Sequence, residues 1–144
     1  MTDEDLDNGL RVLTWRGNSI SLGRTQDFKC VYCDCDLLQS IADYDRWNID
    51  HIDPTVTGPE RDALDNTAVA CRLCNNIKRR YRPQGSTLAE RLADAKRYVL
   101  IGRAQKQARL DAVVQLVTAY RAARRSGDGH TDGHTMVESG PSAA

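Results

Sequence analysis

Four cysteines of the chain form two Cys-x-x-Cys pairs, and a histidine lies between the pairs. The pairs are Cys30/Cys33 and Cys71/Cys74, and the histidine is His51. One such pair lets two thiolates of a single tight turn reach the same ion, and two pairs complete the four-sulfur set that Zn²⁺ favours. The spacing therefore predicts a structural zinc site. A redox dithiol or a group of buried free thiols is the alternative interpretation.

The fifth cysteine and the distance between the pairs need separate interpretations. Cys35 could replace Cys33 as a ligand, but a small buried or free thiol is the interpretation we favour. The 37 residues between the two pairs exceed the gap of a compact zinc ribbon, so another feature is inserted between them. That insertion contains Asp50, His51 and Asn66.

The polar residues between and after the cysteine pairs suit phosphodiester hydrolysis, which needs an activated water and a cation beside the phosphate. Asp50 and Asn75 offer two hard oxygens, a sparse set that leaves room for water and phosphate, as Mg²⁺ prefers. Imidazole exchanges a proton readily near neutral pH, so His51 could act as the general base. Asn66 could hold the long loop or the surroundings of the imidazole, although a turn asparagine after Asp65 is the simpler alternative.

The order of these residues resembles the HNH endonuclease family. The ββα-metal core of that family reads roughly [DH]-H-I-x-P, then Asn, then C-x-x-C-[HN]-x-x-K. Here residues 50–54 read DHIDP, Asn66 follows, and residues 71–78 read CRLCNNIK. Asn75 stands where many members carry a histidine, so the chain is an HNN form. The resemblance covers about residues 28–80.

The resemblance implies a divalent-metal-dependent DNA endonuclease that leaves a 5′-phosphate and a 3′-hydroxyl. In this interpretation His51 activates water, and Asn66 has an orienting role in the site. Asp50 and Asn75 hold a catalytic Mg²⁺ or Mn²⁺. The four paired cysteines hold the structural zinc. A non-catalytic, zinc-stabilised DNA-binding or assembly module is the alternative, and the intact Asp50, His51 and Asn75 count against it.

A basic segment follows the second cysteine pair. Residues 78–125 carry 13 Lys/Arg and 3 Asp/Glu, whereas residues 1–77 carry 7 and 14. At helical spacing, Lys78, Arg79 and Arg82 share a face with Asn75. We expect Lys78, the family's lysine position, to contact the scissile phosphate, and Arg79, Arg80 and Arg82 to contact flanking phosphates of DNA, most readily double-stranded DNA. A merely solvated basic helix end is the alternative.

Hydrophobic periodicity and turn residues predict the elements that must position this site. We expect a strand around 47–51, a loop over 53–65, a second strand near 68–70 and a helix from about 72 that ends before Pro83. The residues Thr87–Glu90 form a capping box that opens a helix, with Gly102 as a candidate break or bend and an end near Arg125. The apolar stripe of 88–120 is interpreted as core or as a self-association surface.

The predicted fold class is α+β, a small zinc-stabilised ββα-metal core with a helical C-terminal extension. We predict an N-terminal segment 1–25 with little assignable structure, a nuclease core 26–83, a basic helical extension 84–125 and a disordered tail 126–144. Two histidines in the tail, His130 and His134, are not expected to bind metal.

Length and composition set the broad class of the protein. No apolar run is long enough to span a bilayer and the acidic start lacks the order of a signal peptide, so a soluble, cytoplasmic protein without a membrane partner is expected. A phage or mobile-element nuclease fits the compact chain, with a homodimer or a phage packaging partner compatible with it.

Overall fold

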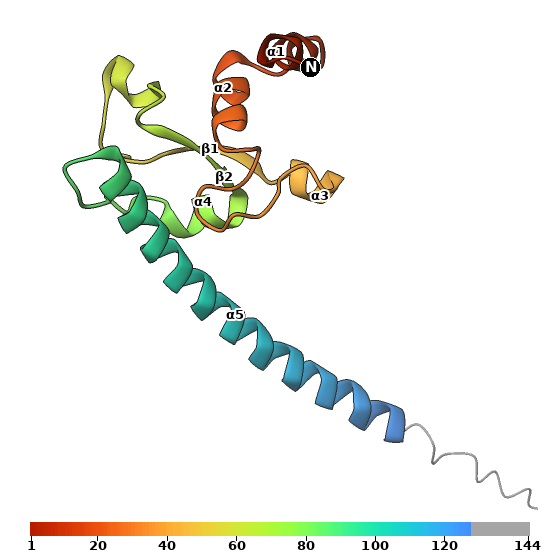
Figure 1. Ribbon diagram of the computed structural model, residues 1–144. Coiled ribbons are helices and arrows are strands. Elements are labelled where there is room, and N and C mark those ends of the chain that lie inside the picture. Colours follow the sequence, from red (N-terminus) through yellow and green to blue (C-terminus); the bar gives the residue numbers. More distant parts are fainter. Residues whose placement is uncertain (128–144) are drawn as a thin grey trace, which may run out of the picture. The chain divides into compact units, whose positions relative to one another are not determined.

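The computed structural model describes residues 1–127 and contains a two-stranded sheet surrounded by helices (Figure 1). Residues 1–106 form one compact unit, and residues 107–127 belong to a second. The elements in chain order are α1 (Asp3–Val12), α2 (Gly17–Thr25), α3 (Ile41–Tyr44), β1 (Trp47–His51), the 3₁₀ helix η1 (Gly58–Asp62), β2 (Thr67–Cys71), α4 (Arg72–Lys78) and α5 (Leu88–Gly127).

The central motif is an antiparallel hairpin followed at once by a helix. β1 pairs with β2 so that Trp47 faces Cys71 and His51 faces Thr67. Helix α4 begins directly after β2, and the Cys71 sulfur caps it by accepting the Cys74 N–H at 3.4 Å. The predicted strand–loop–strand–helix order and the α+β class are therefore confirmed.

The second strand lies at the centre of the first unit. All five residues of β2 are buried, and the edge that faces away from β1 is also covered. Val69 accepts the Val31 N–H at 2.9 Å and donates its own N–H to the Gln26 side chain at 2.9 Å. Because both edges of β2 are hydrogen-bonded, the hairpin and the first cysteine pair are held in one fixed arrangement.

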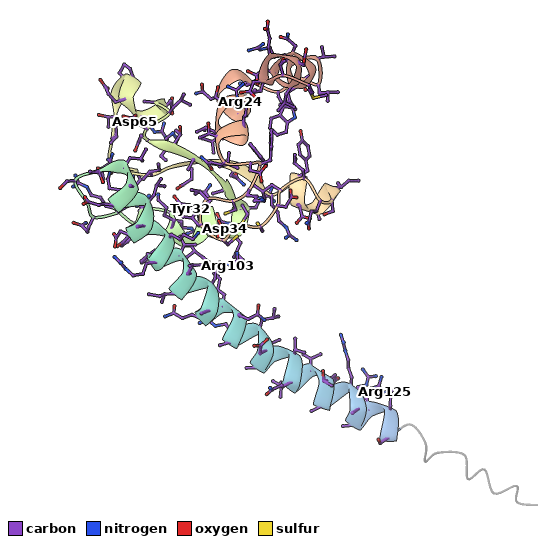
Figure 2. All side chains as sticks on the ribbon, viewed as in Figure 1. Arg24, Tyr32, Asp34, Asp65, Arg103 and Arg125 are labelled. Carbon is purple, nitrogen blue, oxygen red and sulfur yellow. The ribbon has the colours of Figure 1, made fainter. Side chains whose placement is uncertain are left out.

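Two helices occupy the N-terminal segment, for which the sequence predicted little structure. Thr2 and Asp5 form a capping box at the start of α1, with the Asp5 N–H donating to Thr2 Oγ1 at 3.1 Å. Arg24 of α2, labelled in Figure 2, then joins the two helices through an ion pair with Asp7 at 3.1 Å. The prediction missed α1 because its cap uses Asp where the usual pattern has Glu or Gln, and because α1 has no buried residue to give it apolar periodicity.

The long helix α5 begins as the capping box predicted. The Thr87 hydroxyl accepts the Glu90 N–H at 3.2 Å, and the Glu90 carboxylate accepts the Thr87 N–H at 3.1 Å. Gly102, however, neither breaks nor ends the helix. A Cβ built there would lie 2.5 Å from Cγ2 of Ile77, so the glycine permits close approach between α5 and α4.

The predicted apolar stripe divides between the two units. Ala95 and Val99 are fully buried in the core of the first unit, whereas Leu110, Val113 and Tyr120 in the second are more than half exposed. Residues 126 and 127, predicted to be disordered, belong to α5, and residues 128–144 lie outside the described residues. None of the helices within residues 1–127 combines the length and apolarity that crossing a membrane requires.

Candidate active site and metal centre

The four paired cysteines meet at one place. Their sulfur atoms all lie within 4.8 Å of one another, and those of Cys33 and Cys71 are 3.9 Å apart. Tetrahedral zinc with Zn–S bonds of about 2.3 Å needs sulfurs about 3.8 Å apart, so this cluster fits the ion. The fifth cysteine, Cys35, is not part of the cluster, and its carbonyl accepts the Cys30 N–H at 3.0 Å to close the turn. These four residues could therefore bind zinc.

The four thiols influence one another strongly: their mutual hydrogen bonds raise the pKa of Cys30 and of Cys74 and lower that of Cys71. Hydrogen bonds from the Cys30 thiol and its neighbours, with the Cys74 amide, lower the pKa of Cys71 well below the ordinary range of a thiol. Arg103 of α5, labelled in Figure 2, has Nη1 at 3.4 Å from the Cys74 sulfur and 3.9 Å from that of Cys71. A guanidinium at this position offsets negative charge on the sulfurs, and sequence reasoning did not identify it because Arg103 is one basic residue among many in α5.

A polar pocket lies where β1 ends, against helix α4. Its volume is about 230 Å³, and its lining residues are Ile49, Asp50, His51, Pro54, Arg61, Asn75 and Arg79. The pocket thus brings together four of the predicted site residues, which come from β1 and from the helix and its C-cap. Adjacent strand residues point to opposite faces, so Asp50 and His51 can both line it because β1 ends at His51.

The carboxylate of Asp50 is buried and has two partners from other parts of the chain. The Tyr32 hydroxyl donates to it, and Lys78 Nζ lies 3.2 Å from Asp50 Oδ2. Burial raises the pKa of Asp50, while the Lys78 ammonium opposes that rise. An ionised carboxylate offers about four acceptor sites, so these partners leave capacity for a metal ion.

The sequence prediction and the structure place Lys78 in different surroundings. Its side chain is fully buried, and Nζ donates to the backbone carbonyl of His51 at 2.7 Å as well as pairing with Asp50. In this structure Lys78 is therefore turned away from solvent, and its assignment to the scissile phosphate stays a prediction. Lys78 does follow Asn75 at helical spacing, as predicted, but at its position that side of α4 packs on the end of β1 and has no access to solvent.

The imidazole of His51 is held by a residue that the sequence did not single out. His51 Nε2 lies 2.8 Å from Oδ1 of Asp62, which belongs to η1. In the tautomer with the proton on Nε2, this nitrogen donates a hydrogen bond to Asp62. Nδ1 is then the unprotonated nitrogen that a general base requires. No spacing rule connects Asp62 to His51, because the loop between them has no regular geometry.

Asn66 closes the loop that carries Asp62. Its side-chain oxygen accepts the Asp53 N–H at 2.9 Å, and its amide nitrogen donates to the Arg61 carbonyl at 3.0 Å. Its own carbonyl accepts the Ile52 N–H at 2.8 Å. Of the two roles predicted for Asn66, the structure places it in the one that holds the loop.

The three predicted arginines differ in placement. Arg79 lines the pocket from the C-cap of α4, where its positive φ of 41° turns the chain. Arg82 is exposed and lies 3.5 Å from Asp53, and Arg80 is also exposed. Arg61, which enters the pocket from η1, was missed because a single arginine in an irregular loop gives no sequence signal.

The comparisons with known proteins agree with this geometry. Residues 30–80 match the model of the family described as HNH endonuclease. No curated protein and no solved structure was found to match the chain. The matched segment contains both cysteine pairs, the hairpin, α4 and every side chain that lines the polar pocket. Residues 30–80 therefore carry the similarity to the HNH endonuclease family, and that similarity implies a nuclease-type fold for this segment.

Proposed function

We propose that the chain is a divalent-metal-dependent endonuclease that hydrolyses phosphodiester bonds of DNA. One observation carries the proposal: within the segment that matches the family, a single pocket gathers Asp50, His51 and Asn75 with two arginines. A carboxylate, an imidazole and an amide beside cationic side chains supply the groups that phosphate hydrolysis uses.

His51 is the general base in this proposal. Half-exposed at the end of β1, it takes a proton from water through Nδ1 while Asp62 holds Nε2. The water oxygen bonds to phosphorus, the bond from phosphorus to the 3′ oxygen breaks, and the departing 3′ oxygen takes up a proton from solvent. The products are a 5′-phosphate and a 3′-hydroxyl.

Asp50 and Asn75 are the residues that would hold Mg²⁺ or Mn²⁺. They present one carboxylate and one amide oxygen, the hard donors that such ions prefer, and both line the pocket. When bound, the ion supplies charge stabilisation to the phosphate in the transition state. The ion pair with Lys78 and the hydrogen bond from Tyr32 fix the Asp50 carboxylate, so its orientation does not depend on the ion.

Arginines on two elements would hold the nucleic acid. Arg61 and Arg79 line the pocket and are placed to neutralise the phosphate that is cut. Arg80 and Arg82 are exposed beyond the end of α4, where they could contact flanking phosphates. Binding through phosphates predicts weak sequence preference and a steep fall in affinity with salt.

Plasmid cleavage by the zinc-replete chain tests the proposal. Supercoiled DNA is incubated at low salt with Mg²⁺, with Mn²⁺ or with neither, and the zinc content is measured on the same sample. We expect nicking or linearisation that requires the added ion. His51→Ala should lower the rate at least about a hundredfold, the usual contribution of a general base.

Two controls make the result specific. His130→Ala removes a histidine outside the described residues and should cleave like the parent chain. A folded, zinc-replete protein that binds DNA without cutting it under any of these conditions would contradict the nuclease proposal. That outcome would favour the non-catalytic DNA-binding or assembly module instead.

A further inference from the structure

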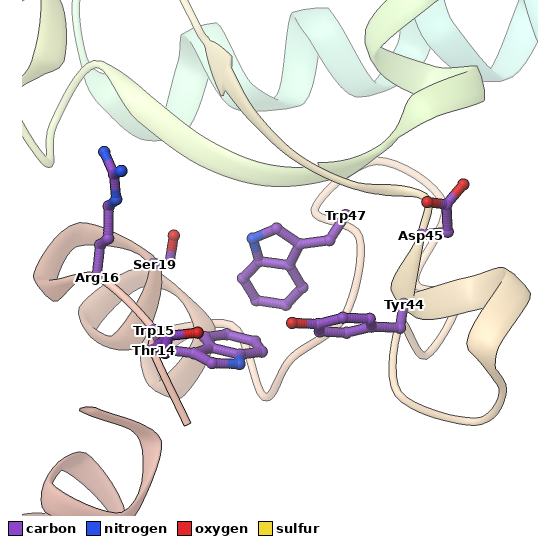
Figure 3. Close-up of a pocket in the computed structure, with 7 residues that line it drawn as sticks. All are labelled: Thr14, Trp15, Arg16, Ser19, Tyr44, Asp45 and Trp47. Carbon is purple, nitrogen blue, oxygen red and sulfur yellow. The ribbon is translucent and has the colours of Figure 1, made fainter. Parts of the chain in front are cut away.

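A second pocket, larger than the polar one, lies at the opposite end of β1. Its volume is about 370 Å³, within the range of small-molecule sites, and Figure 3 shows the side chains around it. Three of the seven lining residues are aromatic. The lining residues are Thr14, Trp15, Arg16, Ser19, Tyr44, Asp45 and Trp47.

Three separate segments bring the aromatic rings together. Trp15 follows the turn between α1 and α2, Tyr44 ends α3, and Trp47 begins β1. The ring centres of Trp15 and Trp47 are 4.8 Å apart, and those of Trp15 and Tyr44 are 6.0 Å apart. Thr14 has a φ of 69°, a conformation uncommon for a threonine, so the turn that presents Trp15 is itself unusual.

The cluster is not simply core. Tyr44 is 51% exposed, and Trp15 and Trp47 are only partly buried. Aromatic faces that gather at a surface, around open space, are typical of sites that stack flat ligands such as nucleobases. Arg16 is exposed at the rim, where Figure 3 places it on the side opposite Asp45.

One polar atom indicates what kind of ligand fits. Trp47 Nε1 is buried and has no hydrogen-bond partner among the described residues. Figure 3 shows this nitrogen on the edge of the indole that is turned toward Ser19. A buried, unpaired N–H calls for an acceptor, which a nucleobase offers and an ammonium group does not. The aromatic rings with an arginine at the rim therefore favour a nucleotide over a cation.

The strand β1 connects this pocket to the polar one. Trp47 and His51 are its first and last residues, four positions apart, so they lie on the same face about 13 Å apart along the strand. Phosphates follow one another at about 3.4 Å along each strand of a DNA duplex, so this distance corresponds to a few nucleotides. One DNA strand could reach both pockets.

We propose that the pocket of Trp15, Tyr44 and Trp47, hereafter the aromatic pocket, binds an unpaired nucleobase of the DNA near the bond that is cut. The inference rests on the proposed nuclease function and adds to it a substrate preference. The chain would favour DNA with an unpaired or extruded base a few nucleotides from the scissile phosphate over fully paired DNA.

Binding, measured without cleavage, tests this preference. The zinc-replete full chain carrying His51→Ala is titrated with a paired duplex and with the same duplex containing one unpaired adenine. Both tryptophans of the chain line the aromatic pocket, so their fluorescence reports on it directly. We expect about tenfold tighter binding of the DNA with the unpaired base, the scale of one stacked base, together with a change in tryptophan emission.

Variants of Tyr44 separate stacking from structure. In the same background, Tyr44→Ala should lower the preference to about twofold or less, while Tyr44→Phe, which keeps the ring, should retain it. Tyr120→Ala removes a tyrosine of α5 that is 60% exposed and should leave the preference unchanged. The melting temperature and zinc content of each variant show that it is folded.

The failures of the two proposals are distinguishable. DNA binding or plasmid cleavage with no preference for the unpaired base and no change in tryptophan emission would overturn only the proposal for the aromatic pocket. An unchanged preference in folded Tyr44→Ala would do the same. A folded, zinc-replete parent chain that neither binds nor cuts DNA would overturn both proposals.

Discussion

The two ends of the hairpin are stabilised in different ways. Near the end of β2, four cysteine side chains converge, and the guanidinium of Arg103 lies beside them. At the end of β1, the charge of the buried Asp50 is balanced within the chain by Lys78, and Tyr32 donates a hydrogen bond to it. With zinc bound, as predicted, the first end would depend on an ion from solution, whereas the second depends on a buried ion pair. A chelator should weaken the first, whereas the second should respond to mutation of Lys78 or to protonation of Asp50.

The largest expected effect is the loss of zinc. Structural zinc in small domains contributes about 10–16 kcal/mol of apparent binding free energy, which is folding free energy when the site forms only on folding. Chelation, or Cys74→Ser, should therefore unfold the hairpin and α4. Circular dichroism melting, with zinc measured in parallel, checks this.

Cys35→Ser is the matched control, because Cys35 lies in the turn that carries Cys30 and Cys33 but outside the four-sulfur cluster. It should keep both the zinc and the melting temperature of the parent chain. Equal destabilisation by Cys35→Ser and Cys74→Ser would show that Cys35 is a ligand, which contradicts the assignment.

The next effect concerns the buried ion pair. Lys78→Met leaves the Asp50 carboxylate buried without its cation, and breaking such pairs typically costs about 3–5 kcal/mol. Chemical denaturation should show this loss at neutral pH. Arg80→Met, on an exposed neighbour, should change the free energy of unfolding by no more than about 0.5 kcal/mol.

The pH dependence of Lys78→Met has a definite sign. Burial already raises the pKa of Asp50, and removal of the ammonium raises it further. The folded state then binds a proton more readily than the unfolded state, so the penalty is complete above the folded pKa and fades as pH falls toward the unfolded value near 4. Adding Asp50→Asn should recover part of the stability at neutral pH. A loss that is independent of pH would contradict the pairing.

A third, smaller effect tests the cation at the cysteine cluster. Residues that hydrogen-bond to metal ligands typically change metal affinity by about 10–100-fold when removed. Arg103→Met should therefore release zinc to a competing chelator at about tenfold lower chelator concentration. Arg109→Met, an exposed arginine of the same helix, is the control and should retain zinc like the parent chain.

The hairpin and the cysteine cluster were predictable because their signals are local, whereas α1 and α2 were not predicted. A Cys-x-x-Cys pair fixes two ligands within one turn, and alternation with turn residues located both strands of the hairpin. The capping box at Thr87 likewise located the start of α5. Gly102 was misread because the close approach of Ile77, which it permits, is a tertiary contact.

The partners within the polar pocket could not be predicted because they are distant in sequence. Tyr32 lies 18 residues from Asp50, and Lys78 lies 28 residues from it. Helical spacing grouped Lys78 with the arginines as a phosphate contact, since a periodicity identifies a face but not what packs against that face. Only the packing of α4 on β1 decides that Lys78 is buried and Arg79 is not.

The smallest effect we predict is that of replacing Asp62, the acid that contacts the His51 imidazole. Asp62 is largely exposed, so its bond to His51 Nε2 orients the ring more than it stabilises charge. Asp62→Ala should slow plasmid cleavage about fivefold, less than the tenfold that 1.4 kcal/mol would give, and leave melting temperature and zinc unchanged. Asp65→Ala, on an exposed acid of the same loop, should leave the rate unchanged. Equal rates for the parent chain and Asp62→Ala, beside an inactive His51→Ala, would mean that the imidazole is oriented by DNA or by the ion instead.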